Sequence, residues 1–185
     1  MARSIWGDLP PVTVAAPPAR VSVKKAAEQV GQVLQEVGEN ALALNSLAME
    51  KRKMKPLFKG FNPEQITPKD LNRAGMILYK FGMIDNHTAE LMSRAGDEFD
   101  SKGKLVDPNK EINAMEFFAN RIIDMKEKAL SGDPYAQILL PDYIKTLHVM
   151  QNLQAFAESG DSYDMRKIKD MESKGLVKRT PNAQA

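Results

Sequence analysis

Residues 66–96 read ITPKDLNRAGMILYKFGMIDNHTAELMSRAG and carry the start and stop signals of two consecutive helices. Thr67 is a good N-cap residue, and Pro68 follows it at the first helical position. Gly82 then ends the first helix, and Asp85 caps a second one a few residues later. Because the connection is short, we expect the two helices to form a helical hairpin.

A helix-turn-helix that reads DNA has the same outline as this hairpin. Its recognition helix would be residues 86–95, NHTAELMSRA, in which Arg94 is the only Lys or Arg. A recognition helix presents several polar and basic side chains to the groove. The composition therefore argues against a DNA-reading role for the hairpin.

The same signals recur further along the chain. Asn113 and Glu116 have the spacing of a capping box, and Gly132 ends the helix that they begin. Asp133 starts another helical stretch, which we expect Pro141 to interrupt because proline has no amide hydrogen to donate.

Residues 142–175 continue the pattern with two more helices. Asp142 caps the first, which Gly160 ends, and Asp161 and Asp164 cap the second. The apolar residues expected inside that last helix are Met165, Ile168 and Met171. No segment sustains the two-residue alternation of a strand, so the sequence predicts an all-α bundle of six or seven helices.

Residues 22–55 carry the longest apolar repeat, with positions spaced alternately by four and three. This repeat predicts one long helix from Ser22 to Lys55, about 50 Å in length. Three of its four a positions are alanine, which makes the seam too thin for a simple dimeric zipper and favours packing in a bundle. The repeat consists of Val23, Ala27, Val30, Leu34, Val37, Ala41, Leu44 and Ala48.

The two halves of this predicted helix differ in their surroundings. Residues 41–49 are apolar most of the way round, so we expect them to be fixed in the core. The first half is more polar on its outer side, which leaves the face of Val23, Val30 and Val37 to dock with a partner.

The chain then divides into four parts. Residues 1–21 contain four of the eleven prolines and predict a flexible Pro-rich arm, followed by the helix 22–55, a compact helical domain 57–175 and a loose tail 176–185. Within the arm, Ile5, Trp6 and Leu9 form an apolar cluster. Two interpretations stay open: the cluster anchors a partner, or the arm folds back and Trp6 covers its own domain.

Residues 51–59, KRKMKPLFK, form a basic patch. Cations near the carboxyl end of a helix stabilise its dipole, which is one explanation of the patch. Contact with nucleic-acid phosphate or with an acidic partner is the other. The cations concerned are Lys51, Arg52, Lys53, Lys55 and Lys59.

Residues 97–111 resemble an EF-hand calcium loop in outline only. When the loop starts at Asp100, lysines occupy the third and fifth positions, where oxygen ligands are required. When Gly103 is placed at the sixth position, Asn109 falls where a bidentate Glu is needed. We therefore predict no metal site in this loop.

The composition removes several classes of function. The chain has no Cys and two His, His87 and His148, which excludes thiol catalysis and Cys-based or His-rich metal sites. No apolar run approaches the ~18 residues of a membrane span, and no catalytic or phosphate-binding motif is present. We expect a protein that is not an enzyme and that needs no cofactor. The eleven Met fit either core filling or an adaptable binding groove.

The leading hypothesis is a non-catalytic cytoplasmic protein–protein interaction module, an adaptor or assembly factor, that uses the arm and the long helix. Self-association is a further option. One alternative is a nucleic-acid-associated protein that binds phosphates through residues 51–59. The other is a substrate or accessory protein of a type III-like (flagellar) export apparatus, whose signals follow no sharp sequence rule and would fit the arm.

Overall fold

The structure is a computed structural model, and it describes residues 23–95, 107 and 109–176. Over these residues the fold is all-α, as predicted, with seven α-helices, two short 3-10 helices and one isolated bridge between Ile66 and Ile112. The elements are α1 (Val23–Val37), η1 (Ala41–Ala43), α2 (Ser46–Lys51), η2 (Lys55–Phe58), α3 (Pro68–Lys80), α4 (Asn86–Arg94), α5 (Ala114–Leu130), α6 (Pro134–Ser159) and α7 (Tyr163–Ser173).

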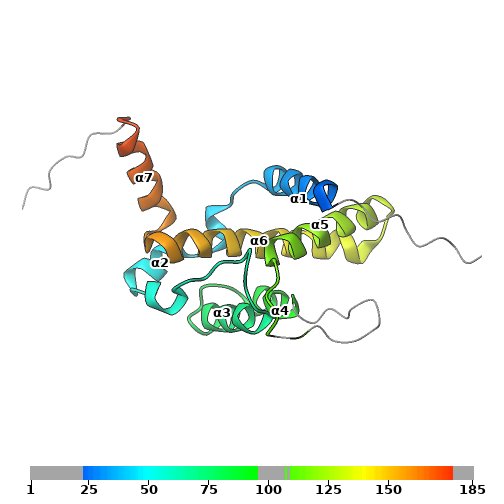
Figure 1. The fold of residues 1–185 in the computed structure, drawn as a ribbon, viewed down its shortest axis with the longest axis horizontal. Coiled ribbons are helices and arrows are strands. Elements are labelled where there is room, and N and C mark those ends of the chain that lie inside the picture. Colours follow the sequence, from blue (N-terminus) through cyan, green and yellow to red (C-terminus); the bar gives the residue numbers. More distant parts are fainter. Residues whose placement is uncertain (1–22, 96–106, 108, 177–185) are drawn as a thin grey trace, which may run out of the picture.

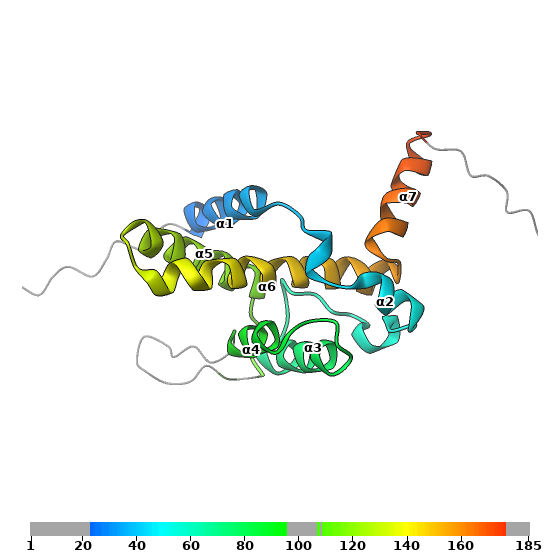
Figure 2. The same cartoon turned by 180° about the vertical axis from the view of Figure 1, so that it is seen from behind.

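Helix α6 is the axis of the fold (Figure 1). All five residues of 146–150 are buried, which requires neighbours on every side of the helix. Helix α5 packs along it and α1 packs on α5, while the hairpin of α3 and α4 lies on the opposite side (Figures 1 and 2). None of the described helices combines the length and the apolar character that crossing a membrane requires.

Three helix starts that the sequence predicts are confirmed by their hydrogen bonds. The side chain of Thr67 accepts from the amide of Asp70, and that of Asp85 accepts from the amide of Thr88. Asn113 caps α5 in the same way. The predicted hairpin is therefore present, and Gly75 brings its helices close, because a Cβ there would lie 3.2 Å from the Cβ of Met92.

The single helix predicted over residues 22–55 is wrong. Helix α1 ends at Val37, Gly38 has a left-handed backbone with φ of +66°, and Leu44 is extended before α2 begins. The side chains of Asn40 and Asn45 cap the starts of η1 and α2, so these polar residues begin new helices after Gly38 has ended α1.

Buried polar groups of α6 hold this break in place. Nε2 of His148 donates to the carbonyl of Val37 at 3.2 Å, and Nδ2 of Asn152 donates to the carbonyl of Asn40 at 2.7 Å. Both side chains are buried, and each satisfies a carbonyl that a continuous helix would have bonded internally. The prediction that residues 41–49 are fixed in the core is confirmed for Leu44 and Met49, which are buried, and is wrong for Leu42 and Leu47, which are exposed.

The interruption predicted at Pro141 is also wrong, since α6 runs unbroken from Pro134 to Ser159. A proline inside a helix costs about 3 kcal/mol of stability. The packing of α6 along α5 offsets that cost, and the side chain of Pro141 lies on the exposed side of the helix. Asp142, predicted to be a cap, lies inside the helix, where its carbonyl accepts from the hydroxyl of Thr146.

Candidate interaction surfaces

The residues that the sequence analysis assigned to a partner are only partly placed by the structure. Ile5, Trp6 and Leu9 lie outside the described residues. Val23 begins α1, and Val30 and Val37 are half-buried against the core of the same chain. The α1 face is therefore partly occupied by the protein's own packing.

The basic patch has two of its five cations engaged. Nη1 of Arg52 donates to the carbonyl of Phe81 at 2.9 Å, and Nζ of Lys55 donates to the carbonyl of Glu158 at 2.9 Å. These carbonyls lie at the carboxyl ends of α3 and α6, so both cations stabilise the dipoles of other helices rather than that of α2.

Helix α3 adds a second row of exposed cations next to this patch. The row consists of three cations and one methionine at spacings of four, three and four, which places them in one stripe on the outer side of the helix: Lys69, Arg73, Met76 and Lys80. All four are exposed, and Met76 exposes 55% of its surface. Tyr79 is also exposed, beside the stripe.

A hollow of about 440 Å³, the α3 hollow, joins the basic patch to α3. Lys59 and Leu57 line one side of it, and Arg73 and Ile77 line the other. Its two carboxylates already have partners. Asp70 accepts from the hydroxyl of Thr67 at 2.7 Å, and Glu111 accepts from the side-chain Nε2 of Gln65 at 2.7 Å.

Helix α7 leaves the end of α6 and projects away from the core (Figures 1 and 2). None of its residues is buried, which corrects the buried side predicted for it: Ile168 exposes 40% of its surface and Met171 36%. Its cap is Ser162, not Asp161 or Asp164. Of the three apolar residues, Met165 near the base is half-buried, and the two further along the helix are left exposed.

The base of α7 is fixed by two hydrogen bonds. Oγ of Ser46 accepts from the amide of Tyr163 at 3.0 Å, and a carboxylate oxygen of Glu50 accepts from the amide of Ser162 at 3.1 Å. Beside it lies a hollow of about 340 Å³, the α7 hollow, which η1, α2 and the start of α7 line. Leu42, one of its lining residues, exposes 94% of its surface.

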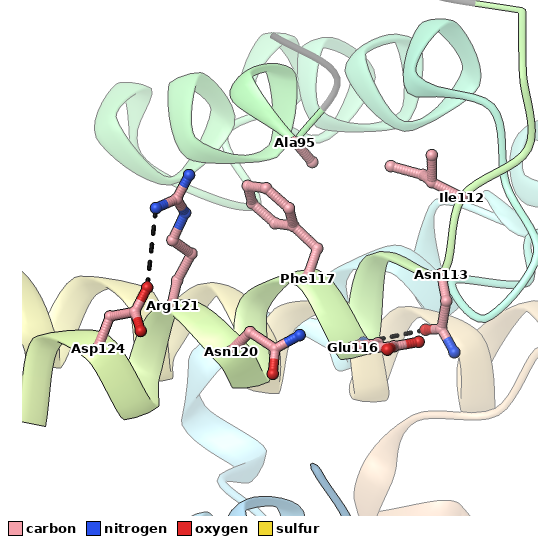
Figure 3. Close-up of a pocket in the computed structure, with 8 residues that line it drawn as sticks. All are labelled: Ala95, Ile112, Asn113, Glu116, Phe117, Asn120, Arg121 and Asp124. Atoms are coloured by element: carbon pink, nitrogen blue, oxygen red, sulfur yellow. Dashed lines mark hydrogen bonds and ion pairs between the residues drawn. The ribbon is translucent and has the colours of Figure 1, made fainter. Parts of the chain in front are cut away.

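A third hollow, of about 300 Å³, lies between the start of α5 and the end of α4 (Figure 3). The ring of Phe117 forms its apolar wall, and the guanidinium of Arg121 lies 5.4 Å from that ring and 3.9 Å from Asp124. None of the described residues that line it is a Ser, Thr, His or Lys, so among them only the two carboxylates could act as a nucleophile or a general base.

Two of the ion pairs between helices link α4 to α6. Nε2 of His87 lies 3.3 Å from a carboxylate oxygen of Asp142, and Lys145 pairs with Asp85. None of these four lines the hollows described above. Within the described residues no cluster of three His, Asp or Glu is placed to hold a metal ion, and most of the 97–111 loop lies outside them.

Partial burial raises the pKa of Asp85, but hydrogen bonds from Lys145 and from the amide and hydroxyl of Thr88 outweigh it and lower the pKa to about 2. A carboxyl whose pKa falls on folding stabilises the protein at pH values above the pKa that it has in the unfolded chain, and that stabilisation is lost as the pH falls from about 4 to about 2.

We expect the variant Asp85→Asn to lose less of its free energy of unfolding than the wild type over this pH range, as measured by urea titrations. Because the side chain is 49% exposed, the difference stays below about 1 kcal/mol.

Lys145→Met provides the matched variant, since it keeps the carboxyl but removes its main partner. It should reduce the same acid-dependent loss. If both variants follow the wild-type pH dependence, the pair contributes nothing to folding.

No family model, curated protein or solved structure matches this chain. Its function is therefore argued from the surfaces. The sequence predicted the basic patch but not the α3 stripe. The signal was present, because the stripe residues are spaced by four, three and four, as on one face of a helix: Lys69, Arg73, Met76 and Lys80. The exposure of α7 could have been predicted only from a weaker signal in the sequence, which is the low content of apolar residues in 163–173.

Proposed function

We propose that the chain is a non-catalytic cytoplasmic protein–protein interaction module, an adaptor or assembly factor. The observation that carries the proposal is α7, an amphipathic helix that projects from the core with none of its residues buried. This helix supports the proposal better than the α1 face, because Val30 and Val37 already pack partly against the core.

The length of α7 explains why it needs a partner. It has 11 residues, and isolated helices shorter than about 12–15 residues are marginal in water. Met165 is already half-buried, but the rest of the apolar side, Ile168 and Met171, gains further stability only when another surface covers it. A protein surface that packs on this side would order the helix and bury its apolar residues together.

The α7 hollow extends the same surface. Leu42 and Leu47 are exposed there beside Tyr163, so a partner that covers the base of α7 also buries apolar area on η1 and α2. Burial of one such leucine contributes about 1.5–3 kcal/mol. The hollow and the helix together supply a small apolar centre of the kind around which protein interfaces form.

The proposal is tested with the double variant Ile168→Asp, Met171→Asp. Both changes place charge on the outer side of α7, where no core packing depends on them, so the circular dichroism spectrum and the midpoint of urea unfolding should stay near wild type. We expect the variant to recover about tenfold less of its partners from native cell extract by quantitative mass spectrometry. Sedimentation velocity in parallel separates a partner protein from a second copy of this chain.

The control is the double variant Leu130→Asp, Ile138→Asp, because both residues are exposed away from α7, at 89% and 69%, and the two changes introduce the same charge. It should leave recovery and sedimentation unchanged. An α7 double variant that retains every partner and the sedimentation coefficient of the wild type contradicts the role of α7.

A further inference from the structure

The strongest concentration of charge lies on residues 51–61 and 71–84, which contain no Asp or Glu. In contrast, the whole chain has 26 Lys and Arg against 24 Asp and Glu. Seven cations fall in the two segments, and all are exposed: Lys51, Arg52, Lys53, Lys55, Lys59, Arg73 and Lys80.

The fold brings these two segments together. The hydrogen bond from Arg52 to the carbonyl of Phe81 fixes the first segment at the carboxyl end of α3. Further along the first segment, Lys59 lines the α3 hollow together with Arg73 of the second segment, so the two segments are also neighbours there. The segment after α2 accordingly lies beside α3 in both views (Figures 1 and 2). We call this surface, residues 51–61 with the outer side of 71–81, the basic face.

Large apolar side chains are exposed among the cations of the basic face. Met76, at 55%, is the most exposed of them. A surface that carries cations alone would bury little apolar area against a partner, whereas this one offers both kinds of contact. The exposed apolar residues of the basic face are Leu57, Met76, Tyr79 and Phe81.

We propose that the basic face binds an acidic segment of a partner protein that also carries apolar side chains. The cations attract its carboxylates, and Leu57 and Met76 receive its apolar residues. Methionine adapts its shape to a bound surface, which suits this role. The proposal extends the interaction function proposed above to a second surface, which shares no residue with α7.

A nucleic acid fits the same face less well. Single-stranded nucleic acids bind through stacking of bases on aromatic rings, and the two most exposed apolar residues of the face, Leu57 and Met76, carry no ring. The exposed aromatic residues, Tyr79 at 44% and Phe81 at 42%, present less of their surface. Arg52 and Lys55 are also committed to carbonyls, which leaves fewer cations to neutralise phosphates. We therefore argue for the acidic protein segment and make the nucleic acid an outcome of the test.

The test measures fluorescence anisotropy of three labelled probes with the full chain. The first probe is a synthetic amphipathic helix of Glu and Leu, the second replaces each Leu by Ser at the same charge, and the third is a single-stranded oligonucleotide of equal charge. We expect the Glu/Leu helix to bind about tenfold more tightly than the Ser peptide, because burial of even one leucine is worth that factor.

Two variants locate the binding on the basic face. Lys51→Glu with Lys53→Glu should weaken the Glu/Leu helix about tenfold, and Met76→Ser should weaken it about fivefold while leaving the Ser peptide unchanged. The controls are Lys110→Glu with Lys128→Glu, which makes the same change of net charge elsewhere, and Ile138→Ser, which removes an exposed apolar residue on α6.

Three results would overturn the proposal. Tighter binding of the oligonucleotide with a steep salt dependence identifies a phosphate-binding face instead. Equal binding of the two peptides shows attraction by charge alone, and no binding of either peptide at low salt shows that the face receives no acidic segment. Because the α7 double variant should bind the Glu/Leu helix like the wild type, failure here leaves the role of α7 intact, and the converse also holds.

Discussion

Leu44→Asp is expected to unfold the protein. Leu44 is 2% exposed and belongs to the core, although it lies in an extended turn rather than in a helix. The substitution removes a buried apolar side chain and leaves a carboxyl without a partner in its place, which together cost more than about 4 kcal/mol. A protein of this size has about 5–15 kcal/mol to lose, so the circular dichroism melt should lose its cooperative transition or shift strongly.

Leu42→Asp is the matched control, two residues away and 94% exposed. It introduces the same side chain in the same segment, so its melting temperature should stay within a few degrees of the wild type. Equal destabilisation by both variants would show that burial of Leu44 does not hold this segment to the core.

Phe118→Ala is expected to lower the free energy of unfolding strongly. Phe118 is fully buried in α5, with its ring 5.2 Å from that of Phe117 and 6.1 Å from that of Tyr143 on α6. Truncation of a buried phenylalanine costs about 3–5 kcal/mol through lost burial and the cavity left behind. Urea unfolding should show this loss as a lower midpoint with an unchanged slope.

Leu130→Ala tests the same helix at its exposed end. We expect it to change the free energy of unfolding by less than about 0.5 kcal/mol. A small effect of Phe118→Ala, comparable to that of Leu130→Ala, would mean that the contact between α5 and α6 does not carry the fold.

The parts of the fold that could be predicted from the sequence are those that neighbouring residues decide. Thr67, Asp85 and Asn113 each cap a helix through an amide three residues later, so a short stretch of sequence contains the whole interaction. The helical hairpin and the all-α class follow from such signals. The basic patch of residues 51–59 could also be predicted, because its cations are neighbours in the sequence.

The features that could not be predicted depend on residues far apart in the chain. The helix break after Val37 is held by His148 and Asn152, which bond carbonyls 111 and 112 residues away. Similarly, Pro141 is accommodated because α6 packs along α5. The basic face needs α3 to meet residues 51–61, and no local pattern shows that the hydrogen bond from Arg52 to Phe81 brings them together.

The central position of α6 has a consequence for how the protein loses its structure. Helices α4 and α5, with η1 and η2, rest directly on α6, and α1 and α3 rest on it through α5 and α4. Loss of α6 would remove the support of every one of these elements at once, so they should exchange their amide hydrogens together and melt as one cooperative unit. Helix α7 joins that unit through the hydrogen bonds at its base and the exposed ion pair of Lys167 with Glu39, so it can change its direction or its partner while the unit stays whole.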